Sequence, residues 1–357
     1  MGNARNIEKD IMKGILIFLV VLGHAQFPGH RFIYLFHMSC FFIVSGYFWK
    51  TSYITNRKST MHMILKRIKT LYIPFVFFNI LFLIVESSFP FIIPENIKSI
   101  TFSFLFLNFV KIIFLRGRTI LTDSTWFLSV LFIVTVLYTF IMLILKKFKI
   151  KENTLCIIIS LISLFLGGIL SYLRINIYEV GTIFSALSMY SLGNEIKNLE
   201  ISNKFFCKDR YKLVILSFIF LILLLLINHQ EVRMIDNSYP NILYFYFASI
   251  FGYIFTKNLS DIISDSKYLK KYFIFFGEHS MAIMCLHMFA FKFVIALQCI
   301  LNNTNVLQYI SSYPVYYANN YWWIVYTIVG VILPLIIVYF INKLLSFVRK
   351  DYYNYEK

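Results

Sequence analysis

Three ionisable side chains stand inside the first two apolar stretches of the chain, and their types and spacing are suited to chemistry. Lys13 and His24 belong to the stretch at 11–28, and His37 follows a Pro-Gly break in the second stretch. Because Lys13 and His24 are eleven positions apart, a helix carries both on one face, about 16 Å apart along its axis. An ionisable group inside a membrane-spanning segment costs a few kcal/mol, so it usually faces a cavity or a partner. These residues therefore indicate a functional site.

The composition indicates an integral membrane protein. Of the 357 residues, 59% are hydrophobic, 40 are Phe and only 14% are charged, and the mean hydropathy is +0.72. Long apolar runs recur, each close to the ~20 residues that cross a ~30 Å hydrocarbon layer. A soluble globule could not cover so much apolar surface. The five cysteines show neither a disulfide framework nor metal-ligand spacing, so we expect no metal site.

We predict an all-α, polytopic membrane bundle of about ten transmembrane helices that forms one domain over residues 1–357. The expected spans are residues 11–28, 32–50, 70–90, 124–145, 154–173, 177–195, 211–228, 240–256, 276–300 and 321–346. With ten spans, both termini are expected on the same side of the membrane, and the loop charges place that side in the cytoplasm.

The loops between these spans alternate in basic charge, as expected if Lys and Arg mark the cytoplasmic side. The four even-numbered loops are rich in basic residues: Lys50, Arg57, Lys58, Lys66, Arg67 and Lys69; Lys146, Lys147, Lys149 and Lys151; Lys197, Lys204, Lys208 and Arg210; Lys257, Lys267, Lys270 and Lys271. The loop at 301–320 carries no charge at all. We therefore interpret the net charge of +17 as a topology signal, with membrane lipids or an anionic cofactor, and not nucleic acid, as partners.

Two stretches need a separate interpretation. Residues 91–123 contain an apolar segment at 100–115, which we expect to be an interfacial or re-entrant helix on the outer side. If that segment crossed the membrane, every later loop would change sides.

The N-terminus also has features of a secretory signal, with Arg5 and Lys9 before an apolar run. Its removal would change the parity of all later spans, and Pro28 leads directly into a second apolar segment.

Four stretches in order along the chain carry recognisable patterns. They are KGILIFLVVLGH with FHMSCFFIVSGYF near the N-terminus, LKRIKTLYIPFVFFN at 65–79, TWFLSVLFI at 125–133 and FGEHSMAIMCLH at 276–287. Together they resemble the acyltransferase-3 family, integral membrane O-acyltransferases that modify bacterial surface glycans and lipids. Ser39 departs from the proline usual in the family, which leaves the kink of the second span open. Lys13 stands where Arg is common, and either cation can contact a phosphate.

The resemblance implies an enzyme of the bacterial inner membrane. It would take an acyl group, most simply acetyl, from acetyl-CoA or another acyl-CoA and pass it to a hydroxyl of a cell-surface glycan or lipid-linked sugar. In the family, the histidine that corresponds to His24 is the catalytic candidate. Its imidazole could accept the proton of a sugar hydroxyl while that oxygen attacks the thioester carbonyl. Transient acylation of His24, or a hydrogen bond that merely joins two helices, are the alternatives.

Other expected site residues lie in the first two spans and in the basic loop that follows them. His37 should lie at the same depth in the membrane as His24. It could donate or accept an orienting hydrogen bond, contact the substrate, or only pack between helices. Lys13 and Arg67 match basic positions of the family at the cytoplasmic end. They would hold the phosphates of acyl-CoA, although basic residues there could also serve topology alone.

Candidates for substrate or channel contacts are Glu86, Trp126 and His287: an acid partner, an aromatic platform for a sugar, and a second buried imidazole. For each, ordinary helix packing or a membrane-boundary position is the alternative.

A different class of function also stays open. The same histidines and cations could line the path of a transporter that exports a glycan or lipid-linked sugar without moving an acyl group. Transporters often have inverted repeats and paired broken helices, and we find neither in the sequence.

Overall fold

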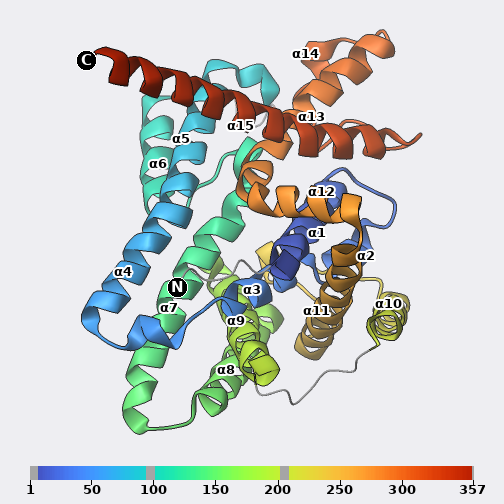
Figure 1. Cartoon of the computed structure of the whole chain (residues 1–357). Coiled ribbons are helices and arrows are strands. Elements are labelled where there is room, and N and C mark those ends of the chain that lie inside the picture. The colour runs from blue at the N-terminus through green and yellow to red at the C-terminus, as the bar shows by residue number, and fades with distance from the viewer. Residues whose placement is uncertain (1–6, 94–100, 202–208, 356–357) are drawn as a thin grey trace.

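The chain is helical throughout the part that the structure describes, with one isolated antiparallel bridge between Arg233 and Ser238 (Figure 1). This computed structural model describes residues 7–93, 101–201 and 209–355. Arg5, Lys204 and Lys208, which contribute to the charge pattern above, lie outside these ranges. The prediction of an all-α fold is confirmed.

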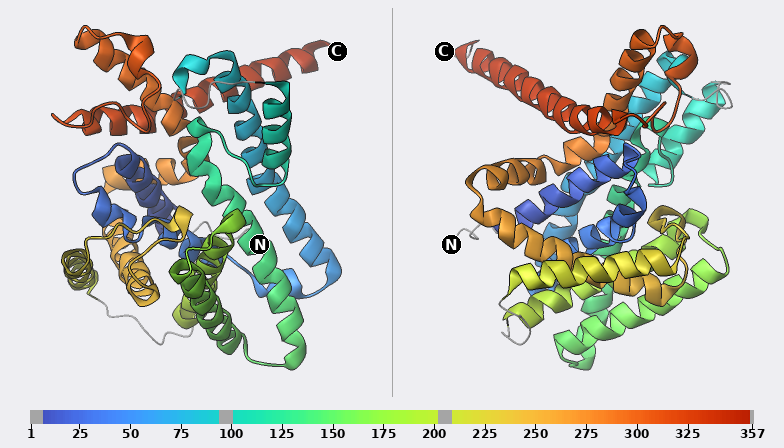
Figure 2. Two further views of the ribbon diagram at one scale, coloured as in Figure 1. Left: turned by 180° about the vertical axis from the view of Figure 1, so that it is seen from behind. Right: turned by 90° about the vertical axis from the view of Figure 1, so that its right-hand side faces the viewer.

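The main helices follow one another with short connections. They are α1 (Ile7–His24), α2 (His30–Tyr34), α3 (His37–Tyr47), α4 (Arg57–Arg67), α5 (Ile73–Ser88), α6 (Phe102–Ile113), α7 (Trp126–Leu145), α8 (Glu152–Tyr172), α9 (Val180–Ile201), α10 (Arg210–Ile227), α11 (Ile242–Asp265), α12 (Lys267–Glu278), α13 (Ser280–Leu301), α14 (Val306–Tyr309) and α15 (Trp322–Tyr355). A short 3₁₀ segment, Ile120–Thr125, leads into α7. The end of α15 extends beyond the bundle (Figure 2).

Six helical segments in the described ranges are long and apolar enough to cross a membrane. They are Arg57–Ser88, Ile120–Phe148, Glu152–Tyr172, Arg210–Ile227, Ser280–Leu301 and Trp322–Lys343. These six coincide with the third, fourth, fifth, seventh, ninth and tenth predicted spans, and they identify the chain as an integral membrane protein. The other four predicted spans coincide with α1, α3, α9 and α11, which are helices but are shorter or more polar.

The four polar helices pack against one another. Helix α1 contacts α3 and α11, and α3 contacts α9. Two glycines permit the α3–α9 contact: a Cβ on Gly46 would lie 1.8 Å from the Tyr190 carbonyl oxygen, and one on Gly193 would lie 1.9 Å from that of Ile43. The buried face of α9 holds Ser185, Ser188, Ser191 and Asn194. Apolar helices such as α8 and α10 present their large side chains outward. The inner helices can therefore carry polar side chains that face protein.

Lys9 corrects one boundary of the sequence prediction. We placed it before the first span, but it lies inside α1 and only 2% of its side chain is exposed. Its Nζ donates a 2.9 Å hydrogen bond to the Tyr253 hydroxyl, lies 3.9 Å from the Glu200 carboxylate and sits over the Tyr47 ring. The prediction was wrong because a nearby carboxylate and two aromatic rings compensate the buried cation, which a sequence window does not show.

Residues 57–69 are also more ordered than the predicted basic loop. Helix α4 continues into α5 through a π-helical turn at Ile68–Tyr72. Pro74 follows that turn and has no backbone N–H to donate to the carbonyl of Thr70, which accounts for the local widening of the helix. Helix α6, the predicted interfacial or re-entrant segment, has 12 residues and exposes several phenylalanines, so it is too short to cross the membrane alone.

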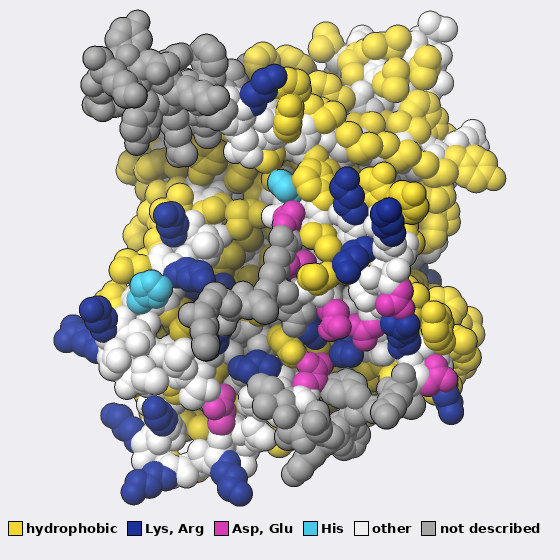
Figure 3. Space-filling view, in the orientation of Figure 1, with side chains coloured by type: hydrophobic (Ala, Val, Ile, Leu, Met, Phe, Trp, Pro, Cys, Tyr) yellow, Lys and Arg dark blue, Asp and Glu magenta, His cyan; other side chains and the backbone are white. Residues whose placement is uncertain are grey.

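The two ends of α1 lie in different environments. Its first turns carry Lys9 and Lys13, and its last residue is His24. Figure 3 shows Lys, Arg, Asp and Glu side chains gathered over one face of the molecule, with apolar side chains around its margins. The His24 end is instead surrounded by three connecting segments, at 25–36, 228–241 and 302–321, which frame a cavity.

Candidate active site

A cavity of about 1000 Å³ lies at the His24 end of α1. Its walls come from four parts of the chain: residues 23–39, 123–126, 231–235 and 313–323, with Phe245 of α11. This volume is at the upper end of the range that small-molecule sites occupy, about 300–1000 Å³. The cavity is therefore large enough to admit a sugar-sized group.

Three of the predicted site residues are histidines, and the structure brings them together from three helices. His24 ends α1, His37 begins α3, and His287 lies within α13. The His24 ring centroid is 5.3 Å from that of His287 and 6.4 Å from that of Tyr34, while His37 stacks on Tyr34 at 5.2 Å. His24 and His37 line the cavity, and His287 lies behind His24 with its side chain fully buried.

The imidazoles of His37 and His287 are oriented by backbone carbonyls. The Nδ1 of His37 lies 2.8 Å from the Ile33 oxygen, and that of His287 lies 2.9 Å from the Ile283 oxygen. A carbonyl oxygen can only accept a hydrogen bond, so each Nδ1 carries a proton. In the neutral rings, the available lone pair is then on Nε2.

The bend between α2 and α3 gives His37 its direction. Phe36, with φ −142° and ψ −22°, interrupts the helix just before His37. Ser39 donates from its hydroxyl to the Phe36 carbonyl at 2.9 Å and also lines the cavity. The second expected span is therefore broken even though serine, not proline, stands at position 39.

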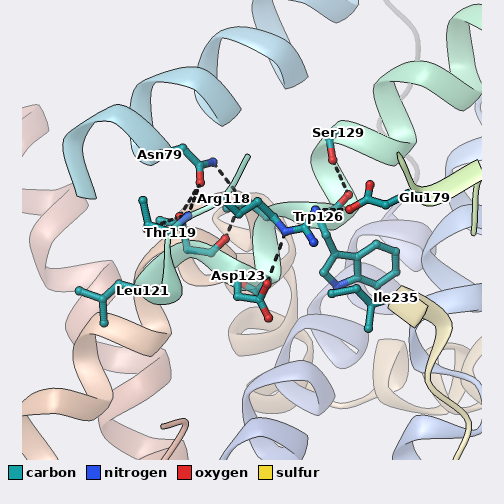
Figure 4. Close-up of polar contacts among 12 residues, drawn as sticks. Asn79, Arg118, Thr119, Leu121, Asp123, Trp126, Ser129, Glu179 and Ile235 are labelled. Atoms are coloured by element: carbon teal, nitrogen blue, oxygen red, sulfur yellow. Dashed lines mark hydrogen bonds and ion pairs between the residues drawn. The ribbon is translucent and has the colours of Figure 1, made fainter. Parts of the chain in front are cut away.

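Trp126 is the first residue of α7 and forms part of the cavity wall. The segment before it is held by ion pairs: Arg118 Nε lies 3.4 Å from Asp123 Oδ1, and the same guanidinium pairs with Glu179 at the start of α9 (Figure 4). Asp123 also lines the cavity. These contacts hold Trp126 and Asp123 at the cavity wall.

The mouth of the cavity carries hydrogen-bonding groups of both charges. The Tyr313 hydroxyl donates to Asp123 Oδ2 at 3.2 Å, and His30 Nε2 lies 3.9 Å from the Glu231 carboxylate. Enclosure of the Tyr313 hydroxyl, together with the Asp123 carboxylate, raises the pKa of that hydroxyl, so it stays protonated and donates at neutral pH. Such a mixture of donors, acceptors and aromatic faces suits a ligand rich in hydroxyl groups.

Glu86 does not line the cavity. Its carboxylate accepts a 2.8 Å hydrogen bond from the Leu121 backbone N–H, and only 7% of its side chain is exposed. Asn79, two turns earlier on α5, accepts from the Thr122 hydroxyl at 2.6 Å and from the Thr119 backbone N–H at 3.2 Å (Figure 4). Both residues therefore position the segment that leads to Trp126.

Lys13 and Arg67 lie away from the histidines. Lys13 Nζ is 3.5 Å from Asp10 Oδ1 and 4.7 Å from the centre of the Phe48 ring. Arg67, half-buried at the end of α4, lies within electrostatic range of the buried Tyr190 hydroxyl on α9. Of the predicted site residues, the histidines and Trp126 therefore lie at or beside the cavity, Lys13 and Arg67 lie away from it, and Glu86 supports the segment before Trp126.

The cavity residues that the sequence analysis missed include Tyr34, Asp123 and Tyr313. Tyr34 could have been found, because its position four after His30 and three before His37 predicts a shared helical face. Asp123 could have been found in the same way, because it stands three residues before Trp126. Tyr313 lies in a connection without periodicity, so nothing in the sequence indicated it.

Comparisons with known proteins add one family and one relative. A family model described as an acyltransferase domain matches residues 6–340. The nodulation protein NolL of Mesorhizobium japonicum is 29% identical over 150 residues, which cover 36% of this chain and 40% of that protein. The similarity thus spans less than half of the relative's length. No solved structure matches the chain significantly.

Proposed function

The chain belongs to the acyltransferase family whose model matches residues 6–340, and we propose that it transfers an acyl group, acetyl in the simplest case, from acetyl-CoA or another acyl-CoA to a sugar hydroxyl. The acceptor is a cell-surface glycan or a lipid-linked sugar. The observation that carries this proposal is the cavity in which His24 and His37 face aromatic and polar side chains. A hydroxyl group that enters this cavity comes within reach of an imidazole.

His24 acts as the general base in this proposal. Its free ring nitrogen accepts the hydroxyl proton while the hydroxyl oxygen attacks the thioester carbonyl carbon. The carbon–sulfur bond then breaks, the ester stays on the sugar, and the proton passes from His24 to the departing thiolate. His37 faces the same cavity and binds the acceptor, and Trp126 offers its ring to one face of the sugar.

The acyl-CoA donor is proposed to approach from the opposite end of α1. Lys13 and Arg67 supply the cations that phosphate groups require. Near Arg67, the hydroxyls of Tyr190 and Thr135 are buried close to each other, and neither makes a hydrogen bond to any other group within the described residues. Such groups fit the amide and phosphate chemistry of a CoA molecule. The thioester arm would have to cover roughly the 16 Å that separates Lys13 from His24 along the helix.

We further propose that the chain forms one domain of ten spans in the bacterial inner membrane, with both termini in the cytoplasm. In this arrangement α1, α9 and α11 cross the membrane inside a ring of apolar helices, α2 and α3 together form the second, broken span, and α6 lies at the outer interface. The face rich in charged side chains (Figure 3) is then cytoplasmic. The His24 cavity opens toward the outer side, where a surface glycan is found.

The test compares the surface glycans of cells that carry the intact gene, its deletion, His24→Ala and His62→Ala. NMR spectra before and after mild alkali report base-labile esters, and membrane levels of each variant are measured. His62 is exposed on α4 and serves as the matched control. We expect the esters to be absent in the deletion and in His24→Ala and present in His62→Ala. Glycan export should stay intact in all of them. Unchanged esters in His24→Ala, or a loss of export without a loss of esters, would refute the proposal and favour a transporter.

A further inference from the structure

The second buried imidazole, His287, has an unusual hydrogen-bonding state. Its side chain is fully buried in the middle of α13, and its Nδ1–H donates to the Ile283 carbonyl. The lone pair of the neutral ring is therefore on Nε2. Within the described residues this Nε2 has no hydrogen-bond partner. A buried acceptor without a donor is costly, so such a group usually serves a function or receives a donor in another state of the protein.

The group best placed to supply that donor is His24. The two ring centroids are 5.3 Å apart and the ring planes differ by 36°. On another side, the edge-to-face contact with Phe291, at 5.7 Å, offers only carbon atoms. A modest rotation of the His24 ring would direct one of its N–H groups at His287 Nε2. His37 differs, because it lines the cavity itself and stacks on Tyr34.

We propose that His287 is the positioning residue of the site: its Nε2 accepts a hydrogen bond from the ring N–H of His24 that points away from the cavity. This inference rests on the proposed function, in which His24 is the base. The hydrogen bond selects the tautomer of His24 whose other nitrogen is unprotonated and faces the acceptor hydroxyl. When His24 takes the hydroxyl proton, the same hydrogen bond stabilises the imidazolium. His287 itself neither gains nor loses a proton.

The choice of variants separates this role from packing. In His287→Gln, the amide oxygen reaches the place of Nε2 and can accept from His24. In His287→Asn, the shorter amide reaches only the place of Nδ1, so it keeps the bond to Ile283 and lacks the acceptor. His287→Leu removes both. His279→Leu is the matched control, because His279 also bonds a backbone carbonyl, that of Phe275 at 2.9 Å, from the half-buried position just before α13.

The assay uses the purified full-length protein in nanodiscs, acetyl-CoA as donor and alkali-treated surface polysaccharide of the host as acceptor. We expect His287→Leu and His287→Asn to lower kcat by about 10–100-fold, as is typical when an orienting partner of a functional imidazole is removed, with KM for both substrates within about twofold. His287→Gln should retain most of the wild-type kcat, and His279→Leu should match the wild type.

The inference is overturned if His287→Asn outperforms His287→Gln, which indicates a structural bond to Ile283, or if His287→Leu retains the wild-type kcat. A change confined to KM would also overturn it, because it places His287 in substrate binding. Failure of the underlying proposal gives a different pattern. In that case the wild type transfers no acyl group to the polysaccharide, or His24→Ala remains as active as the wild type.

Discussion

Lys292 should be essential for the wall of the cavity formed by residues 313–323. Its Nζ donates to the carbonyls of Ile310 at 2.9 Å and Ser312 at 2.8 Å, directly before that wall begins. The side chain is 5% exposed, and the carboxylate whose charge acts on it is that of Glu86. One lysine thus joins α13 to the 302–321 connection, and its charge acts on the buried carboxyl group of Glu86 on α5.

The magnitude follows from these contacts. Lys292→Met removes two charge-assisted hydrogen bonds, each worth about 1.5–3 kcal/mol, and leaves Glu86 without its cation. Since the charge effect on Glu86 acts over a longer distance than a direct ion pair, the two hydrogen bonds dominate, and we expect a loss of about 3–6 kcal/mol in the free energy of unfolding. Adding Glu86→Gln should cost little in this background, since an amide oxygen still accepts from the Leu121 N–H without a buried charge.

The measurement is equilibrium unfolding in mixed micelles, followed by tryptophan fluorescence, for both single variants and the double variant. Lys257→Met is the control: its partner Asp261 lies 3.1 Å away on the same helix in a partly exposed pair, so we expect a loss of about 1 kcal/mol or less. The reasoning is refuted if Lys292→Met unfolds with nearly the wild-type free energy. It is equally refuted if Glu86→Gln costs as much in the Lys292→Met background as it does in the wild type.

Two further predictions concern helix packing and the cavity mouth. Gly46→Ala should prevent accumulation of folded protein in the membrane, because its Cβ would lie 1.8 Å from the Tyr190 carbonyl oxygen. Membrane fractionation measures the protein level, with Ser45→Ala as the control. A normal level of Gly46→Ala in the membrane would contradict the prediction. Asp123→Asn loses the charge that pairs with Arg118 in a partly exposed contact, so we expect the acceptor KM to rise by about threefold to tenfold, equivalent to about 1 kcal/mol. An unchanged acceptor KM in steady-state kinetics would show that Asp123 plays no part in acceptor binding.

The polar core shows where sequence reasoning reached its limit. Hydropathy identified α8 and α10 correctly, because lipid contact imposes a strong and continuous apolar pattern on each of them. Helices α1 and α11 pack more extensively against protein, so lipid contact does not mark their ends, and their boundaries shifted by several residues. For the same reason, Lys9 was assigned to the region before the first span although it is buried within the bundle.

The class of the protein, its helical character and the choice of His24 and His37 as candidate site residues could all be inferred from the amino-acid sequence, because they depend on composition and on spacing within one segment. The folded structure was needed to show that His287 stands beside His24, that Asp123 and Tyr313 meet at the mouth of the cavity, and that Glu86 supports a backbone segment. Spacing along a helix reports which residues share a face, whereas the partners of that face depend on which distant helices pack against it.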